Sequence, residues 1–382
     1  MKNIAILGST GSIGKNAIFV IRRFPRKFKV SALSTNSNID LLLRQAREFK
    51  PACVCVRDEA ASRRAAKKLG RGVKLFSGSD GLAAMARSVE ADRLLLAVSG
   101  SEALAPLLAA IDSGKDVALA NKEALVMAGA LVMARVAKNK VKILPIDSEQ
   151  SAIWQCLAGE DAQKLKNIYL TASGGPFLKL ERSRFKSITR AQVLRHPRWK
   201  MGKKITVDSA TLVNKGLELI EAMFLFGVGA DKIKIIIHPE AIIHSMVEFV
   251  DGVTIAQLSA TDMRIPIQYA LTYPERLPGP LGKFDFCKLG AMHFQKPDLA
   301  RFPSLGLAYR AARELGTMPA VFNAANEVAV EYFLKGSSGF LRIVKVIEGV
   351  MKKHRNKPAP SLTDITEADA WARQEALRGL SF

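Results

Sequence analysis

Two carboxylates and a hydroxyl stand side by side in the stretch ILPIDSEQSAIW. Asp147, Ser148 and Glu149 follow a short apolar run, and a helical pattern resumes after them. Two interpretations are open. Asp147 as N-cap, with Gln150 three residues on, fits a capping box at a helix start. The alternative is a metal site at the C-terminal end of a buried strand, where open α/β sheets bind their ligands. On these residues alone the cap is favoured, because such caps are common.

A glycine-rich turn follows the first apolar run. The stretch GSTGSIG, residues 8–14, lies between a predicted strand and an amphipathic helix. Glycines at such a junction let backbone N–H groups approach a pyrophosphate, which the helix N-terminus also attracts. We therefore predict a dinucleotide site, the alternative being a tight turn with close helix packing. The end of the second predicted strand, residues 34–38, has no acid before Asp40, which favours NADP over NAD.

A third polar group lies in KITVDSATLVNKGLELIEAMFLF. We interpret KITV as a strand and the following residues as a helix that Asp208 or Ser209 caps. Asn214 and Glu218 are four residues apart and share a helix face, and Lys215 adjoins Asn214. Taken alone, these residues are more typical of a solvated helix face than of a site.

The order of elements predicts an α/β fold. An N-terminal Rossmann-type parallel sheet of six strands with five crossovers should occupy residues 1–146. A central α+β catalytic domain is expected over 147–273, a proline-rich linker over 274–302 and a C-terminal helical domain over 303–382. The predicted strands are NIAILG, KVSALS, ACVCVR, RLLLAVSG, DVALAN and VKILPI, and the first predicted helices cover 13–24, 39–49, 58–68, 101–113 and 122–138.

Composition sets limits on the class of protein. The chain has 382 residues, 48% of them hydrophobic and 24% charged, as in ordinary globular proteins. We see no signal peptide or membrane-spanning run, so we expect a cytoplasmic protein without a membrane partner. The four cysteines, Cys53, Cys55, Cys156 and Cys287, lack zinc spacing and are predicted to be buried thiols.

The net charge of +22 attracts anions. Nine basic residues gather between Glu181 and Lys204, around His196 and Trp199, without a zinc-finger or RNA-binding motif. A small phosphorylated ligand therefore fits better than nucleic acid, and a solvated basic loop remains possible. The nine are Arg182, Arg184, Lys186, Arg190, Arg195, Arg198, Lys200, Lys203 and Lys204.

Several stretches together resemble one enzyme family. GSTGSIG, ANKE, ILPIDSE, TASGGPF, HPRWKMGKKITVDSATLVNKGLELIEA, IHPEAIIHSMVEFVDG and NAANEVAV occur in the order typical of 1-deoxy-D-xylulose 5-phosphate reductoisomerases. The resemblance covers essentially the whole chain. It implies a homodimer that uses NADPH and a divalent metal (Mg, Mn or Co) to make 2-C-methyl-D-erythritol 4-phosphate in non-mevalonate isoprenoid biosynthesis, and that fosmidomycin inhibits. The substrate would rearrange to an aldehyde, which NADPH reduces.

The resemblance also implies roles for residues. The metal ligands would be Asp147, Glu149 and Glu218, and the catalytic residues Glu149, Lys122, His196 and Glu218. Substrate contacts would be Lys122, Ser148, Glu149, Ser173, His196, Ser209, Asn214, Lys215 and Glu218, with Ser173, Ser209, Asn214 and Lys215 around the phosphate. NADPH contacts would be Thr10, Gly11, Ser12, Ile13, Asn36, Ser37, Asn38, Asn121, Glu123 and Gly202. Trp199 and Met201 would belong to a mobile flap near 195–204.

This chain departs from the family's usual pattern at Gln150, often His in relatives, and at Ser37, often basic. Two rival functions are weaker. Another NAD(P)-dependent oxidoreductase, such as a semialdehyde dehydrogenase, needs an activated cysteine near a histidine. A basic nucleic-acid-binding protein is favoured only by the charge.

Overall fold

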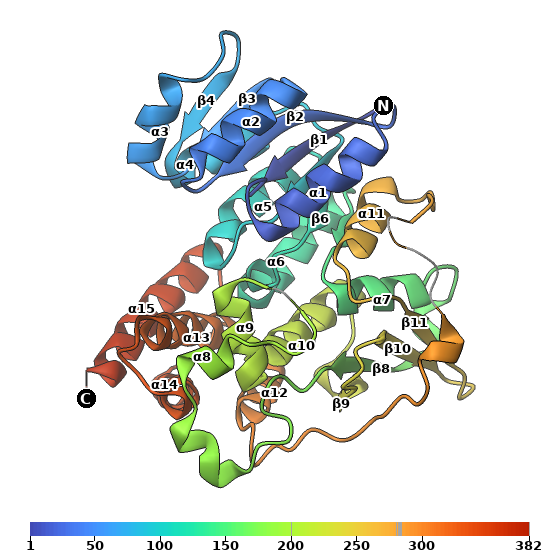
Figure 1. The fold of residues 1–382 in the computed structure, drawn as a ribbon. Helices are drawn as coiled ribbons and strands as arrows, with labels where there is room; N and C mark the ends of the chain where they lie inside the picture. The colour runs from blue at the N-terminus through green and yellow to red at the C-terminus, as the bar shows by residue number, and fades with distance from the viewer. Residues whose placement is uncertain (200, 280, 282–284, 382) are drawn as a thin grey trace. The chain divides into compact units, whose positions relative to one another are not determined.

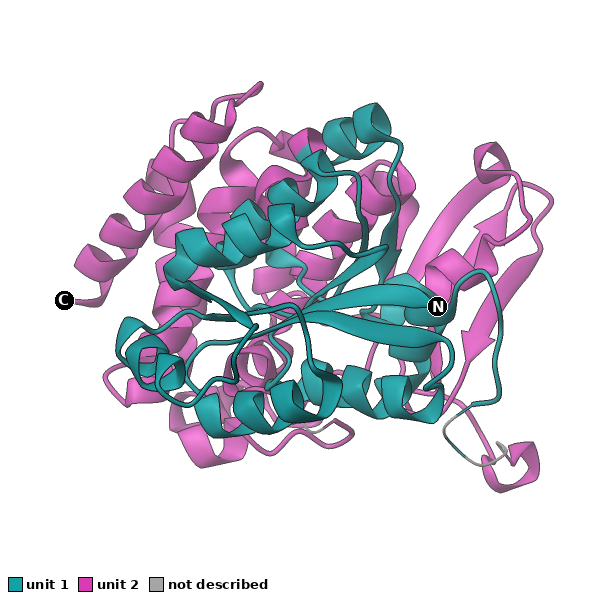
Figure 2. Ribbon diagram, turned by 90° about the horizontal axis from the view of Figure 1, so that it is seen from above, with its two compact units in different colours: residues 1–124, 132–151, 262–283 teal, residues 125–131, 152–261, 284–382 magenta. Residues whose placement is uncertain are grey.

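The computed structural model describes residues 1–199, 201–279, 281 and 285–381. Most of its helices and strands are labelled in Figure 1. The chain forms two compact units, coloured separately in Figure 2. The first comprises residues 1–124, 132–151 and 262–283, and the second comprises 125–131, 152–261 and 284–382. The domain boundaries expected from the sequence remain predictions, and residues 280 and 282–284 of the expected linker lie outside the described part.

The first unit is built on a parallel sheet with the order β4-β3-β2-β1-β5-β6-β7. Six of these strands match the predicted ones; β4 and the helix after it were missed. The strands are β1 Lys2–Leu7, β2 Phe28–Thr35, β3 Cys53–Val56, β4 Lys74–Ser77, β5 Arg93–Leu96, β6 Asp116–Leu119 and β7 Ile143–Pro145. Without β4, the order is that of a dinucleotide-binding sheet, in which the strand order reverses beside β1.

The crossovers of this unit are helical. Their apolar faces are buried, as at Ile18 and Ile21 of α1 and Leu42 of α2. Helices of the first unit are α1 Ser12–Arg23, α2 Ile39–Phe49, α3 Glu59–Ala66, α4 Gly78–Ser88, η1 Ser101–Ala103, α5 Leu104–Asp112 and α11 Arg264–Thr272. Two further helices, α6 Glu123–Asn139 and α7 Ser148–Cys156, contribute residues to both units.

The second unit contains a mixed sheet with the order β11-β10-β8-β9. β10 is antiparallel to both of its neighbours, and β8 is parallel to β9. The strands are β8 Leu165–Ala172, β9 Ile233–Ile237, β10 Ile243–Phe249 and β11 Thr254–Leu258.

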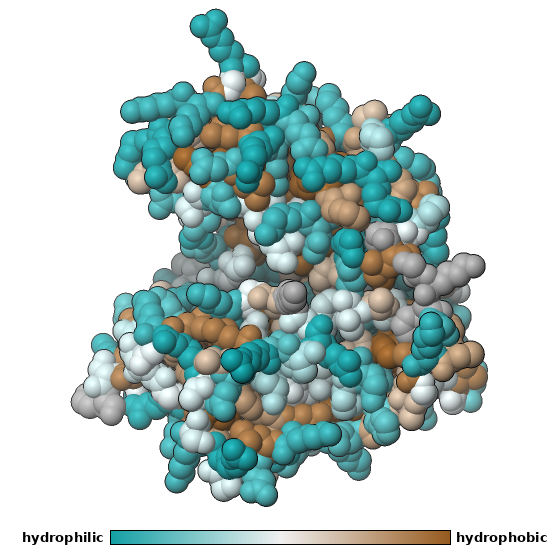
Figure 3. All heavy atoms as spheres, in the orientation of Figure 1, coloured by the Kyte–Doolittle hydropathy of each residue, from teal (hydrophilic) through white to brown (hydrophobic). Residues whose placement is uncertain are grey.

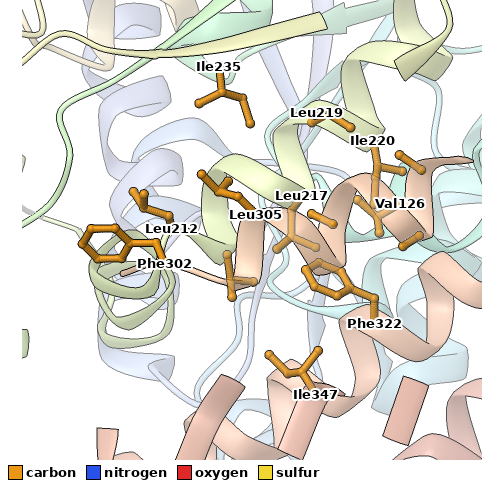
Figure 4. Close-up of a cluster of buried hydrophobic side chains, with 14 of the residues drawn as sticks. Val126, Leu212, Leu217, Leu219, Ile220, Ile235, Phe302, Leu305, Phe322 and Ile347 are labelled. Carbon is orange, nitrogen blue, oxygen red and sulfur yellow. The ribbon is translucent and has the colours of Figure 1, made fainter. Parts of the chain in front are cut away.

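Helices make up the rest of the second unit. Leu217, Leu219 and Ile220 of α10 share one apolar core with Leu305 of α12 and Phe322 of α13 (Figure 4). The helices are η2 Ala162–Lys164, η3 Arg182–Ser187, α8 Arg190–Val193, α9 Lys203–Thr211, α10 Val213–Phe226, η4 Ala230–Lys232, η5 Phe286–Lys288, α12 Ser304–Glu314, α13 Met318–Lys335, α14 Phe340–Lys353 and α15 Leu362–Leu380.

The surface is mostly hydrophilic on the face that is drawn. Hydrophilic side chains cover much of the face drawn in Figure 3, with scattered hydrophobic ones between them.

Cys287 is exposed on η5, so the prediction of a buried thiol is wrong there, whereas Cys53, Cys55 and Cys156 are buried. Among the described residues, no helix combines the length and apolar character needed to cross a membrane.

Candidate functional site

The glycine turn after β1 forms a close-packed cradle. Gly8 has φ +90°, and a Cβ atom there would lie 2.6 Å from the carbonyl oxygen of Ala97, just after β5. A Cβ at Gly14 would lie 2.3 Å from the carbonyl oxygen of Gly8. These approaches exclude larger residues and place the start of α1 directly on the turn. The cradle therefore lies where the strand order reverses, the usual place for a pyrophosphate.

Hydrogen bonds join this cradle to the end of β2. The Gly8 amide donates to Ser34 Oγ over 2.8 Å, and the Ser9 amide donates to the Ser34 carbonyl over 2.8 Å. The hydroxyls of Thr10 and Thr35 are 2.6 Å apart. Asn38 then caps α2 by accepting from the Leu41 amide. The polar stretch 34–38 thus shapes the turn and lies beside it.

Gly14→Ala should destabilise the protein, because the added methyl group overlaps the Gly8 carbonyl. We expect a loss of about 1–3 kcal/mol in the free energy of unfolding, measured by urea denaturation. Gly70→Ala is the matched control, since a Cβ there meets no atom within 4 Å. Equal stabilities of the two variants would contradict the close packing.

The residues before α6 are fixed by Asn121. Its amide nitrogen donates to the carbonyls of Val98 and Gly100, both over 3.0 Å, and its oxygen accepts from the Ala124 amide over 2.8 Å. Its neighbour Lys122 is buried, with Nζ 2.8 Å from Asp147 Oδ2. This ion pair connects the start of α6 with the end of β7.

Asp147 and Glu149 flank the start of α7 in the first unit. The helix begins at Ser148, and the Ser151 amide donates to the Asp147 carbonyl over 2.8 Å. The Ser148 hydroxyl donates to Glu149 Oε2. A helix start at the carboxyl end of a strand therefore presents two carboxylates and a hydroxyl; the capping box itself remains a prediction.

Glu218 is buried on α10 in the second unit, with 1% of its surface exposed. The Asn214 amide donates to its Oε1, and the Lys215 ammonium, also buried, donates to its Oε2. The shared helix face predicted for Asn214 and Glu218 is confirmed, but the solvated-face interpretation is wrong. The reason is that α10 is surrounded by the core of the second unit, so its charges must be paired with one another.

One sequence prediction fails next to this helix. KITV was predicted to be a strand, yet Lys203–Thr211 is helix α9, and Ser209 lies in its last turn. Leu212, at φ +60°, separates α9 from α10, and neither Asp208 nor Ser209 caps α10. The β-branched residues favour a strand locally, but Val207 and Ala210 are fully buried in the apolar core of the second unit.

His196 joins two of the predicted phosphate contacts. Its Nε2 lies 3.0 Å from Ser209 Oγ and 3.4 Å from Ser173 Oγ. Its Nδ1 accepts from the amides of Arg198 and Trp199, over 3.2 and 2.9 Å. A nitrogen that accepts two N–H bonds carries no proton, so the proton of the neutral ring is on Nε2, facing the two serines. Burial lowers the pKa of His196 to about 4, so the ring is neutral at pH 7.

This lowered pKa makes folding stability depend on pH. The unfolded chain protonates His196 near its ordinary value of 6.5, while the folded protein does not until about 4. The contribution of the neutral ring to the free energy of unfolding is therefore fully present above pH 6.5 and is lost as the pH falls towards 4. His196→Asn should lose less stability than the original protein between pH 7.5 and 5 in urea denaturation. Parallel pH dependences would contradict this assignment.

Trp199 and Gly202, two further predicted residues, follow His196 in the same segment of the chain. The centroids of the Trp199 and His244 rings are 6.2 Å apart, and Gly202 immediately precedes α9. Lys200, within the expected flap, lies outside the described residues. Asn326 on α13 donates to Asp208 Oδ1 over 2.8 Å, which holds α9 against the C-terminal helices.

Sequence reasoning missed Arg57 in the first unit. Its Nε donates to Asn36 Oδ1 over 3.0 Å, although the two residues are 21 positions apart. Only the pairing of β2 with β3 brings them together, so no local pattern could reveal the contact.

The fold and the cradle define a class. The first unit has the strand order and the glycine turn of an NAD(P)-binding domain, and the second unit gathers hydroxyls, an imidazole and a buried carboxylate. Three family models match the chain. They describe 1-deoxy-D-xylulose 5-phosphate reductoisomerase over residues 4–129, its C-terminal domain over 143–226, and the DXP reductoisomerase C-terminal domain over 258–375.

Individual proteins agree with these matches. The chain is 49% identical over 380 residues to the 1-deoxy-D-xylulose 5-phosphate reductoisomerase of Pelotomaculum thermopropionicum, covering 99% of this chain and 98% of that one. A Zymomonas mobilis reductoisomerase solved with NADPH is 39% identical, with a TM-score of 0.93 and 99% of each chain covered. A reductoisomerase solved with NADPH, fosmidomycin and magnesium is 37% identical, with a TM-score of 0.94 over 100% of this chain and 98% of that one. This chain belongs to the 1-deoxy-D-xylulose 5-phosphate reductoisomerase family.

Proposed function

We propose that this enzyme converts 1-deoxy-D-xylulose 5-phosphate to 2-C-methyl-D-erythritol 4-phosphate, with NADPH as reductant and a divalent metal ion as cofactor. The observation that carries the proposal is the full-length match to a reductoisomerase solved with NADPH, fosmidomycin and magnesium. The reaction belongs to non-mevalonate isoprenoid biosynthesis, and fosmidomycin should inhibit it.

The proposed metal ligands are Asp147, Glu149 and Glu218. Carboxylate oxygens are the donors that Mg²⁺ and Mn²⁺ prefer, so the residue types fit a hard cation. Lys122 and Lys215 already hold Asp147 and Glu218 through ion pairs. A bound cation would supply Lewis-acid polarisation of the substrate oxygens.

The substrate phosphate is proposed to bind in the second unit. Ser173 and Ser209 offer hydroxyls on either side of the His196 Nε2–H, and Asn214 and Lys215 add an amide and an ammonium. Because burial keeps His196 neutral, it acts as a hydrogen-bond donor that orients the substrate without adding charge. Lys122, Ser148, Glu149 and Glu218 complete the proposed substrate contacts.

NADPH is proposed to bind across the glycine cradle. The place of the turn supports this position, since it lies where the strand order reverses and directly before α1, whose N-terminus attracts a pyrophosphate. NADPH would supply the hydride. The proposed contacts are Thr10, Gly11, Ser12, Ile13, Asn36, Ser37, Asn38, Asn121, Glu123 and Gly202. The segment 195–204 is proposed to close over substrate and exclude water.

Cys156 does not fit the activated nucleophile that the dehydrogenase alternative needs. Cys156 is buried on α7, and burial raises its pKa to about 11, so the thiol stays protonated at pH 7.

A homodimer in the cytoplasm is also proposed. β11 lies at an edge of the second unit's sheet, and strands at such edges can pair with another chain. Sedimentation velocity should give twice the chain mass of 41.6 kDa. A monomer at working concentration would remove this part of the proposal.

The test of the function is an NADPH absorbance assay with 1-deoxy-D-xylulose 5-phosphate and Mg²⁺ or Mn²⁺. We expect NADPH consumption that needs substrate and metal and that fosmidomycin stops, with 2-C-methyl-D-erythritol 4-phosphate identified by NMR. Absence of turnover with either metal would contradict the proposal.

A further inference from the structure

Arg57 occupies the carboxyl end of β3, next to the end of β2. Its backbone amide donates to the Thr35 carbonyl over 3.0 Å, and the next amide, of Asp58, donates to the Asn36 carbonyl over 3.0 Å. Its side chain continues this pairing, because Nε donates to Asn36 Oδ1 over 3.0 Å. The guanidinium is therefore anchored to the loop that follows β2.

The end of β2 is where a dinucleotide's adenosine ribose binds in this type of sheet. There, an acid selects NAD by binding the 2'-hydroxyl, and a nearby arginine accommodates the 2'-phosphate of NADP. Residues 34–38 of this chain contain neither an acid nor a base. Ser34, at the same strand end, accepts a hydrogen bond from the Gly8 amide, which joins the stretch 34–38 to the cradle. A 2'-phosphate bound beside this stretch would find its cation outside it.

Arg57 has the exposure and chemistry to be that cation. Its side chain is 32% exposed, which leaves part of the guanidinium open to a ligand. The bond from Nε to Asn36 fixes the orientation of its plane, and a guanidinium held in this way can offer parallel N–H donors to phosphate oxygens. Its Nη1 contacts the carboxylate of Glu102 on η1, after β5. That carboxylate is an anion held beside the guanidinium by the protein itself.

We propose that Arg57 recognises the 2'-phosphate of NADPH and sets the preference of this enzyme for NADP over NAD. The inference rests on the proposed function, since it takes NADPH as the cofactor. Glu102 holds the guanidinium in the absence of cofactor, and the 2'-phosphate takes over its place as the anionic partner. Ser37 is uncharged, as is the rest of the stretch 34–38. The positive charge for the 2'-phosphate comes instead from Arg57 at the end of β3.

Calorimetric binding of NADPH and NADH to the purified protein tests this assignment. Arg57→Gln should raise the dissociation constant of NADPH by about 10-fold or more, because it removes a hydrogen bond between charged groups. The dissociation constant of NADH should change by less than about 2-fold. Adenosine 2',5'-bisphosphate and 5'-AMP should show the same contrast without the nicotinamide. Arg63→Gln is the matched control, because Arg63 is an exposed arginine on the adjoining α3; it should leave both constants unchanged.

Two further variants separate recognition from support of the fold. Glu102→Gln should tighten NADPH binding by about 1.5- to 5-fold, because it removes the competing anion. Arg57→Lys should recover part of the NADPH affinity. Equal losses for NADPH and NADH in Arg57→Gln, or no loss for either, would overturn the proposal. If the original protein binds neither NADPH nor NADH, the proposed function itself fails. If the original protein binds NADPH and Arg57→Gln binds it equally tightly, only the proposed role of Arg57 is refuted.

Discussion

Glu149→Gln should lower metal-dependent turnover by about 10³-fold or more while NADPH binding persists. The amide keeps the shape of the side chain but removes the negative charge at the start of α7. Loss of Lewis-acid polarisation worth about 4 kcal/mol corresponds to this factor. The measurement is kcat with Mg²⁺, together with the calorimetric dissociation constant of NADPH.

Glu160→Gln provides the control for this prediction. Glu160 is exposed, four residues beyond the end of α7, so the same change of charge there should leave kcat unaltered. Undiminished turnover in Glu149→Gln would remove this residue from the proposed metal site. A parallel loss of NADPH binding would indicate instead that the first unit no longer folds correctly.

Lys215→Met should both destabilise the protein and weaken substrate binding. It leaves the Glu218 carboxylate buried without the ammonium that contacts it, and breaking a buried pair in this way costs about 3–5 kcal/mol. The proposed phosphate site also loses its cation, so KM for 1-deoxy-D-xylulose 5-phosphate should rise by about 10-fold or more. Urea denaturation and steady-state kinetics at a temperature where the variant is folded provide the two measurements.

Lys335→Met is the matched control for stability. Lys335 also pairs with a glutamate on the same helix, Glu331, but both side chains are about 60% exposed. Screening by water makes such a pair worth less than about 1 kcal/mol. If Lys215→Met is as stable as Lys335→Met, the ammonium of Lys215 does not stabilise the buried carboxylate of Glu218, and the prediction is contradicted.

The sequence predicted the features that local patterns encode. Alternating apolar runs and helical stretches gave the parallel sheet, and the GSTGSIG turn predicted the cradle. β4 was missed because it has only four residues and lies partly exposed at the edge of the sheet. Helix α9 was mistaken for a strand because packing outweighed the preference of its β-branched residues.

Contacts between distant residues could not be predicted from the residues alone. The pairing of Arg57 with Asn36 depends on the register of β2 with β3, and the approach of His196 to Ser173 joins separate loops. The burial of Glu218 depends on helices more than 80 residues downstream, which pack around α10. The roles of Asp147, Glu149 and Glu218 as one ligand set come from the family resemblance, and spacing alone would have favoured a helix cap and a solvated face.

Anomalous diffraction from crystals grown with Mn²⁺ and NADPH tests the central claim most directly. The account predicts one strong manganese peak within about 2.0–2.6 Å of carboxylate oxygens from Asp147, Glu149 and Glu218. A peak bound by other residues, or one that lacks any of these three carboxylates, would contradict it.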